Sequence, residues 1–199
     1  MSKYVFITGA PGSKWSRVAK GLWKSDSVDQ SDDTDQFNNV RVSHCGAYFG
    51  PGMGFGENFD IPFEEFTKEQ LEAEFDRPFS GSSVRIIKSH HFAYNLEYIA
   101  KTWPDCPIVL VEREDDSCFT WWTLAGGFDI TYPSYVWYQD NETMYKQICK
   151  QNFEMKKFRK KHPYVLTHGC YQLCDLIGIK KPTVPDSYDY ANVMIMVRK

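Results

Sequence analysis

The chain has 199 residues and a formal net charge of -3. This length supports one sizeable core and does not require a second domain, so we expect a single domain over residues 1–199. The slightly acidic balance gives no global basic field, which argues against nonspecific nucleic-acid binding. The chain has no run of about 18 apolar residues and no signal-peptide pattern at its start. These features predict a soluble, cytoplasmic protein with no membrane span.

The six cysteines are scattered along the chain. Cys170 and Cys174 are four residues apart on a predicted helix, which indicates two buried thiols rather than a metal pair. No second close pair supplies further zinc ligands, so we expect reduced thiols and no metal. Aromatic residues make up 16% of the chain, and we expect several of them to line a pocket as well as the core.

The first predicted strand covers residues 3–8, and a helical pattern follows from Val18. Between them lies a glycine-containing turn, an arrangement in which backbone N–H groups and a helix N-terminus bind an anionic phosphate. Four side chains of this turn would add donors: Ser13, Lys14, Ser16 and Arg17. The spacing does not match the nucleotide-triphosphatase P-loop, because the two glycines are three residues apart and Ser13 precedes the lysine. An ordinary strand-to-helix turn is the alternative.

Two loop-like segments come next. Residues 25–39 are acidic and polar, which predicts an exposed, mobile loop, and the spacing of the aspartates matches no calcium loop. Residues 40–43 favour a short strand. Cys45 to Phe59 is rich in glycine and aromatic residues, which suits either a lid or acceptor pocket, or a packed loop without a ligand.

The most informative stretch runs from Val84 to Trp122. A helix precedes it, and a capping box at Thr67 opens that helix. The stretch itself predicts a strand, a polar turn and an amphipathic helix up to Trp103. A second strand over residues 108–111 and a second polar turn follow. Strands joined by a helix are parallel, so both polar turns lie at the carboxyl edge of the sheet. Open α/β sheets bind ligands at that edge.

Charged residues leave both strands at this edge. Lys88, Ser89, His90 and His91 follow the first strand, and residues 112–116 follow the second. A base, two fixed cations and a hydroxyl could converge there on a phosphate or sulfate group. The alternative is that both turns are merely solvated loop ends.

The remaining elements complete an α/β pattern. A helix starts at about Trp121 and ends near Gly126. The long helix over residues 145–161 ends in cations that match its dipole, or that form a patch for an anionic acceptor or a membrane surface. Its predicted apolar set is Ile148, Phe153 and Phe158. A strand over 164–167, a helix over 171–177 closed by Gly178, and a strand over 193–197 follow. We therefore expect three α/β/α layers around a central, mainly parallel sheet.

In their order, these elements resemble the sulfotransferases that use 3′-phosphoadenosine 5′-phosphosulfate (PAPS). Those enzymes have a strand ending in Lys-Thr-His, then a helix, then a strand ending in Arg before a Ser and paired aromatics. Lys88 to His90 is similar to the first element, and Arg113, Thr120 and Trp121 to the second. The turn over 9–16 occupies the place of the family's 5′-phosphosulfate loop. The resemblance extends from about Lys3 to Ile179.

The chain departs from this family at several points. Gly12 stands where the family's loop has Lys or Arg, and Lys14 stands where it has glycine. The segment from Arg113 to Thr120 is one residue shorter than usual, and no C-terminal donor loop of the Arg-Lys-Gly kind is evident.

The resemblance implies a fold like that of P-loop-containing nucleotide hydrolases and a transfer of the sulfuryl group from PAPS. The acceptor would be a hydroxyl or amine of a small molecule, glycan or peptide, the product would be 3′,5′-phosphoadenosine (PAP), and no metal is required. His90 would be the base, and Lys88 and Lys14 would stabilise charge on the sulfuryl group. Arg113 and Thr120 would hold the 3′-phosphate. The implied donor-binding residues are Gly12, Ser13, Lys14, Trp15, Ser16, Arg17, Arg113 and Thr120.

Trp15 would stack near the adenine, although a core tryptophan fits the pattern equally. Two other functions remain open. A P-loop kinase acting on a nucleotide or metabolite would need a magnesium-binding acid, for which Asp115 and Asp116 are the suitable residues. A non-catalytic nucleotide-binding or interaction protein could also use the same fold.

Overall fold

The structure is a computed structural model that describes residues 2–32, 46–129, 139–184 and 190–196. Within these ranges it contains one mixed sheet in the order β2-β1-β3-β5-β4. The strands are β1 (Tyr4–Gly9), β2 (Arg85–Lys88), β3 (Ile108–Val111), β4 (Tyr164–Leu166) and β5 (Val193–Met196). β1 pairs in parallel with both β2 and β3, whereas β5 runs antiparallel to β3 and β4. The α/β class is confirmed, and β5 makes the sheet mixed.

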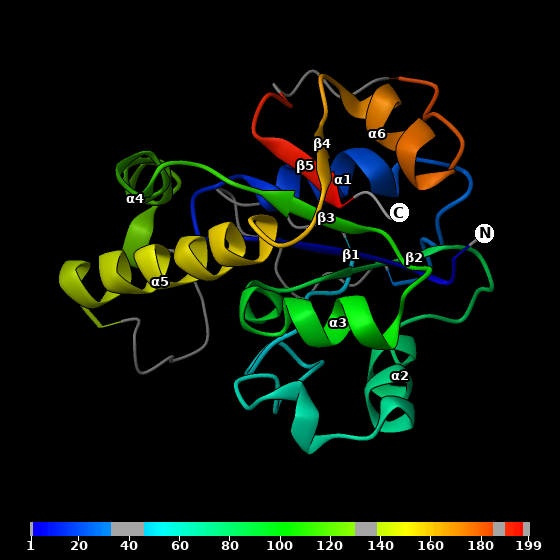
Figure 1. The fold of residues 1–199 in the computed structure, drawn as a ribbon, viewed down its shortest axis with the longest axis horizontal. Helices are drawn as coiled ribbons and strands as arrows, with labels where there is room; N and C mark the ends of the chain where they lie inside the picture. Colours follow the sequence, from blue (N-terminus) through cyan, green and yellow to red (C-terminus); the bar gives the residue numbers. More distant parts are fainter. Residues whose placement is uncertain (1, 33–45, 130–138, 185–189, 197–199) are drawn as a thin grey trace.

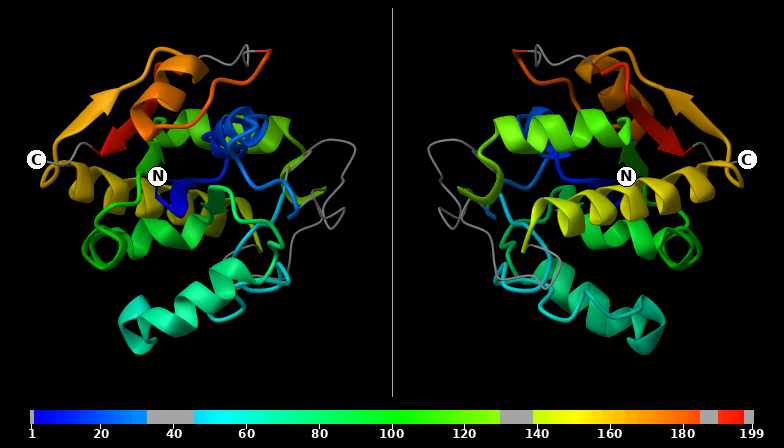
Figure 2. Two further views of the ribbon diagram at one scale, coloured as in Figure 1. Left: turned by 90° about the vertical axis from the view of Figure 1, so that its right-hand side faces the viewer. Right: turned by 90° about the vertical axis from the view of Figure 1, so that its left-hand side faces the viewer.

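Helices lie on both faces of the sheet. The α-helices of the described ranges are α1 (Trp15–Trp23), α2 (Lys68–Asp76), α3 (Leu96–Thr102), α4 (Asp115–Leu124), α5 (Asn141–Arg159) and α6 (Cys170–Ile177). Short 3-10 turns occur at η2 (Phe63–Glu65), η3 (His90–Tyr94) and η4 (Gly127–Asp129). α1 and α6 cover one face and α3 and α5 the other, while α4 lies beyond the carboxyl end of β3 (Figure 1). Figure 2 shows α2 as the helix farthest from the sheet.

The strand β1 explains this layering, because its side chains alternate between two cores. Tyr4 and Phe6 belong to the core beneath α3 and α5, and Val5 and Ile7 belong to the core beneath α1. All six residues of the strand are buried. A strand buried on both faces needs a continuous apolar run, as the sequence has here.

Aromatic rings fill the first of these cores. Phe75 on α2 lies at the centre, with ring centroids 5.4 to 6.3 Å from those of Tyr4, Phe6, Phe49, Phe59, Phe63, Phe92 and Trp103. Most of these pairs meet edge to face, the geometry that the ring quadrupole favours. Phe49 and Phe59 come from the glycine-rich loop, so this loop is packed into the core. That position favours the packed-loop alternative over a lid.

Several helix ends follow the predicted local signals. The capping box at Thr67 opens α2, and Gly178 closes α6 in the left-handed conformation with φ 75°. Cys170 and Cys174 are buried thiols, as predicted. Within the described ranges the structure therefore confirms these three predictions.

Other boundaries differ from the prediction. α1 begins at Trp15, before the first apolar residue of the periodic pattern. α4 begins at Asp115, so the second polar turn is shorter than expected and its last two acids lie in the first helical turn. α5 begins at Asn141 because Asp140 forms a capping box. Phe153 is 63% exposed and does not belong to the apolar face of α5, a place taken by Met144 and Met155.

The described part of the acidic segment is not simply exposed. Asp29 and Asp32 are 5% and 1% exposed. Asp29 accepts hydrogen bonds from the backbone and hydroxyl of Ser31 and lies 3.8 Å from the guanidinium of Arg85. The expectation of a fully exposed loop was wrong here, because specific partners compensate the burial of both carboxylates. The strand predicted over 40–43 and Val197, the predicted end of the last strand, lie outside the described residues. So do residues 132–138, a stretch of the sequence that is rich in aromatic residues.

Candidate active site

The carboxyl ends of β2, β1 and β3 lie at one edge of the sheet, as the sequence predicts. The backbone N–H of Ser89 donates to the carbonyl of Ile7, which ties the turn after β2 to β1. Ser89 also caps η3, because its hydroxyl accepts a hydrogen bond from the N–H of His91. These bonds fix the direction in which the chain leaves β2 and therefore the place of His90.

His90 is held in a single orientation. Its Nδ1 lies 2.7 Å from the carbonyl oxygen of Gly9, at the end of β1. Since a carbonyl only accepts hydrogen bonds, Nδ1 carries the proton and Nε2 is the basic nitrogen. The imidazole is 7% exposed, and its centroid lies 4.8 Å from the ring of Trp15 and 5.6 Å from that of Tyr48. A base with a fixed tautomer and orientation suits proton transfer at this edge.

Cations from the turns after β1 and β3 gather beside Trp121. The ammonium of Lys14 lies 3.2 Å from the centroid of the Trp121 ring, and the guanidinium carbon of Arg113 lies 5.9 Å from it. Partial burial lowers the pKa of Lys14, and the charges of Arg113 and Arg17 lower it further. An anion placed beside Lys14 would offset the repulsion between its ammonium and the two guanidinium groups. We call Lys14, Arg17 and Arg113 the cation cluster.

The acidic residues of the turn after β3 point toward α5. Asn152 on α5 donates from Nδ2 to the carboxylate of Asp115, at 2.6 Å, and to the backbone carbonyl of Arg113, at 2.9 Å. Each acid has its own partner on α5, in the pairs Glu112 with Arg159, Glu114 with Lys156, Asp115 with Asn152 and Asp116 with Tyr145. These contacts anchor the turn, so it is not merely a solvated loop end.

The turn between β1 and α1 packs closely against α4. Gly12 has φ 78°, and a Cβ at this position would lie 1.8 Å from the carbonyl oxygen of Cys118. Only glycine allows this approach. Ser13 is fully buried, and its N–H donates to the carbonyl of Ala10 in a tight turn. Lys14 follows with φ 67° as the residue before α1.

The remaining residues predicted to bind the sulfuryl donor differ in solvent exposure. Trp15 is 3% exposed and packs on His90 and Tyr48, which favours the core alternative over stacking on adenine. Ser16 is half-buried and Arg17 is exposed at the start of α1. Thr120 is exposed on α4, two residues from both Cys118 and Trp122, and so nearly opposite their buried face. Trp121, rather than Thr120, contacts the cation cluster.

Lys88 is almost fully buried, at 2% exposure. Its backbone carbonyl accepts a hydrogen bond from the N–H of Phe49, so its strand end is joined to the glycine-rich loop. Burial raises the pKa of Asp32, while hydrogen bonds from Trp23 and Ala47 and the charge of Lys88 oppose this shift. The ammonium of Lys88 therefore has a buried carboxylate as a neighbour, which the sequence did not indicate.

His91 provides a test of the burial of this turn. It is 5% exposed, and burial lowers its pKa to about 4, against the opposing charge of Asp60. The ordinary imidazole pKa in the unfolded chain is near 6.5, so the unfolded state binds more protons between these two values. The contribution of the neutral, buried His91 side chain to the free energy of unfolding is complete above about pH 6.5. It is lost as the pH falls toward 4. We expect the free energy of unfolding to decrease by about 3 kcal/mol over this range.

Urea denaturation at several pH values would measure this effect. His91→Gln should show a smaller pH dependence than the wild type, and the difference between the two curves isolates the imidazole from the carboxylates that titrate in the same range. His168→Gln, at an exposed position on the surface, is the matched control and should behave as the wild type. Equal pH dependence in His91→Gln and the wild type would contradict the burial of His91.

The site contains residues that the sequence did not single out. Tyr48 lies in the glycine-rich loop, Asp32 in the acidic segment and Asn152 within a long helix. Tyr48 packs on His90, Asn152 donates to the carbonyl of Arg113, and Asp32 accepts hydrogen bonds from Trp23 and Ala47. These partners are distant in the sequence, so no local spacing could reveal them. The sequence indicates Trp121 only as one of two paired aromatics. Its contacts with Lys14 and Arg113 depend on how α4 packs against the turn after β1.

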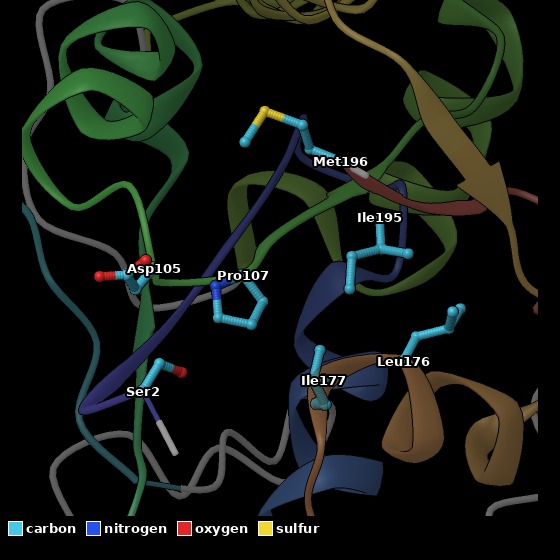
Figure 3. A pocket seen from close by; sticks show the side chains of 7 residues that line it. All are labelled: Ser2, Asp105, Pro107, Leu176, Ile177, Ile195 and Met196. Carbon is cyan, nitrogen blue, oxygen red and sulfur yellow. The ribbon is translucent and has the colours of Figure 1, made fainter. Parts of the chain in front are cut away.

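A pocket of about 320 Å³ lies at the opposite edge of the sheet (Figure 3). Its lining residues are Ser2, Asp105, Pro107, Leu176, Ile177, Ile195 and Met196. Ser2 and Pro107 precede β1 and β3, and Met196 ends the antiparallel β5, so this is the amino edge of the parallel strands. The pocket is therefore separate from the candidate active site.

Two features are absent from the described residues. No group of three or more His, Cys, Asp or Glu side chains is arranged to hold a metal ion there. No helix among them is long and apolar enough to cross a membrane. Comparison of the chain with protein-family models, with curated proteins and with solved structures gives no match.

Proposed function

We propose that the chain is a PAPS-dependent sulfotransferase, an enzyme that transfers a sulfuryl group from PAPS to a hydroxyl or amine of its acceptor. The observation that carries the proposal is that a tautomer-fixed histidine and the cation cluster lie at the same edge of the sheet. His90 follows β2, Lys14 follows β1 and Arg113 follows β3, in the order of the resemblance to the family. A P-loop-like fold, with β1 between two parallel strands and a glycine turn into α1, forms part of the proposal.

The backbone of Lys14 supports this alignment. Residue 14 has φ 67°, a left-handed conformation that favours glycine. The family has glycine at the corresponding place in its 5′-phosphosulfate loop. A lysine held in this conformation keeps the shape of the loop and adds a charge within the cation cluster. Lys14 would thereby replace the basic residue that the family carries where this chain has Gly12.

In the proposed reaction the acceptor gives its proton to Nε2 of His90 as its oxygen or nitrogen attacks the sulfur. The new bond to sulfur forms in line with the breaking bond between sulfur and the bridging oxygen of the 5′-phosphate, and PAP leaves with that electron pair. Lys14 stabilises the charge that develops on the leaving oxygens, and Lys88 is the second candidate for this role. Arg113 and Arg17 bind phosphate through charge-assisted hydrogen bonds.

The kinase alternative is less well supported by the same contacts. It requires a carboxylate available to magnesium beside the phosphates. Asp115 and Asp116 accept hydrogen bonds from Asn152 and Tyr145 on α5, both at 2.6 Å. These acids are therefore used to hold α5 against the turn after β3.

Calorimetric titration with PAP tests the proposal. We expect the wild type to bind with a micromolar dissociation constant and Arg113→Ala to bind at least about 100-fold more weakly, because charge-assisted bonds to phosphate are lost. Lys101→Ala, an exposed cation on α3, is the matched control and should bind as the wild type. Stronger binding of ATP with magnesium than of PAP would favour a kinase. Binding of neither nucleotide would overturn the proposal and favour a non-catalytic interaction protein.

A further inference from the structure

Asp32 is a buried carboxylate with two well-placed donors. Oδ1 accepts a hydrogen bond from the indole N–H of Trp23, at 3.0 Å, and Oδ2 accepts one from the backbone N–H of Ala47, at 2.8 Å. Gly46 packs so closely that a Cβ there would lie 2.3 Å from Oδ2. The carboxylate thus joins Trp23, at the end of α1, to Ala47, at the start of the glycine-rich loop.

The segment that Asp32 holds leads directly to the proposed base. Tyr48 follows Ala47 and is 2% exposed, with its ring 5.6 Å from that of His90 and 5.1 Å from that of Trp15. One residue later, the N–H of Phe49 donates to the carbonyl of Lys88 at 3.1 Å. Tyr48 is therefore fixed on one side by Asp32, through Ala47, and on the other by the end of β2.

We infer that Asp32 is a positioning residue of this site, whose carboxylate holds Ala47 in place so that the ring of Tyr48 fixes the imidazole of His90. The inference rests on the function proposed above, in which His90 accepts the acceptor's proton. Asp32 touches neither the donor nor the acceptor in this scheme. It acts through the packing of Tyr48.

The chemistry of the carboxylate explains why a neutral substitute would not serve. Both donors present an N–H, so both oxygens must accept, whereas an asparagine offers one oxygen and one NH₂ group. In Asp32→Asn one buried N–H would face another donor, and the segment would shift away. His90 would then lose the ring contact that keeps its Nδ1 on the carbonyl of Gly9.

Nitrogen-15 NMR of the histidine side chains in the full chain, without nucleotide, tests this inference. The His90 signals are assigned by their absence in His90→Asn. We expect one tautomer, protonated at Nδ1, in the wild type and a mixture of tautomers with broadened signals in Asp32→Asn. Asp29→Asn is the matched control, since Asp29 is buried in the same segment but contacts Ser31 and Arg85 instead. It should leave the His90 signals unchanged.

Tyr48→Leu should alter the His90 signals in the same way, and combining it with Asp32→Asn should add no further change, because both act along one chain of contacts. Should Asp32→Asn fail to fold, Trp23→Phe removes a single hydrogen bond to the carboxylate and should shift the signals in the same direction. With PAPS, we expect kcat of the folded variant to fall about 10- to 100-fold while the affinity for PAP changes less than about twofold.

Unchanged His90 signals in Asp32→Asn, or in Trp23→Phe if that variant is used, would overturn the inference whatever the nucleotide results. Failure of the wild type to bind PAP would instead overturn the proposed function, and the NMR comparison would still decide whether Asp32 positions His90. The two failures are therefore distinguishable.

Discussion

His90→Asn is expected to lower kcat for sulfuryl transfer from PAPS by about 100- to 10,000-fold while leaving PAP binding unchanged. The asparagine amide reaches the position of Nδ1 and can still donate to the carbonyl of Gly9, so the turn after β2 keeps its anchor. What it lacks is the basic nitrogen equivalent to Nε2. The loss should therefore appear in the chemical step rather than in binding.

Transfer of labelled sulfuryl from PAPS to a panel of phenol, alcohol and amine acceptors would measure the rate, and calorimetry with PAP would measure the binding. His168→Asn, at an exposed histidine, is the control and should keep full activity. His90→Gln is informative beside it, because its longer amide reaches the Nε2 position and gives up the bond to Gly9. If His90→Asn kept more than about a tenth of the wild-type kcat, the proton acceptor would have to be another group.

Gly12→Ala is expected to destabilise the fold by about 3 kcal/mol or more. Two effects add at this position. The backbone has φ 78°, which strains any residue with a side chain, and the new Cβ would lie 1.8 Å from the carbonyl oxygen of Cys118. Because this carbonyl oxygen is part of the backbone of α4, a rotamer change cannot relieve the clash. The turn and the helix would have to separate, which would also move Lys14 away from Trp121.

Gly178→Ala separates these two effects. Gly178 has φ 75°, similar to Gly12, but a Cβ there has no neighbour within 4 Å. We expect this variant to lose only about 1 kcal/mol, the cost of the left-handed conformation alone. Urea denaturation of both variants gives the comparison. Equal losses in the two would mean that Gly12 does not approach α4 as closely as described.

The two predictions probe different properties of the same turns. His90 is attached to β1 by its hydrogen bond to Gly9, which an asparagine can keep, so its chemistry can be removed with little effect on the fold. Gly12 is the contact by which the turn after β1 meets α4, so its replacement affects stability and the cation cluster together. A variant that loses activity at position 12 therefore says little about catalysis unless its stability is also known.

Local sequence patterns predicted much of the fold. The β-branched runs at 84–87 and 108–111 become parallel neighbours of β1, and the turns that follow them share one edge. The capping box at Thr67 and the glycine at Gly178 set helix ends as expected. These features arise from side-chain periodicity and from the capping of backbone groups. Both involve residues close together in the chain, so they can be recognised in the sequence alone.

The candidate site depended on contacts that no local pattern contains. The sequence placed charged residues after two strands, but it could not determine that Glu112, Asp115 and Asp116 face α5. It indicated a lysine in an unusual loop position, and only the packing of α4 brings Trp121 beneath its ammonium. It predicted an exposed acidic loop, whereas Asp32 is buried against Trp23 and Ala47.

By itself, then, the sequence predicted most of the described helices and strands, the parallel arrangement of the central strands and the edge at which His90, Lys14 and Arg113 lie. The tertiary structure decided which charges meet, that β5 makes the sheet mixed, and that the glycine-rich loop joins the core. The reason is physical. Helix caps and strand periodicity are satisfied within a few residues, whereas a buried charge or ring is stabilised by whichever distant group the packing brings into contact with it.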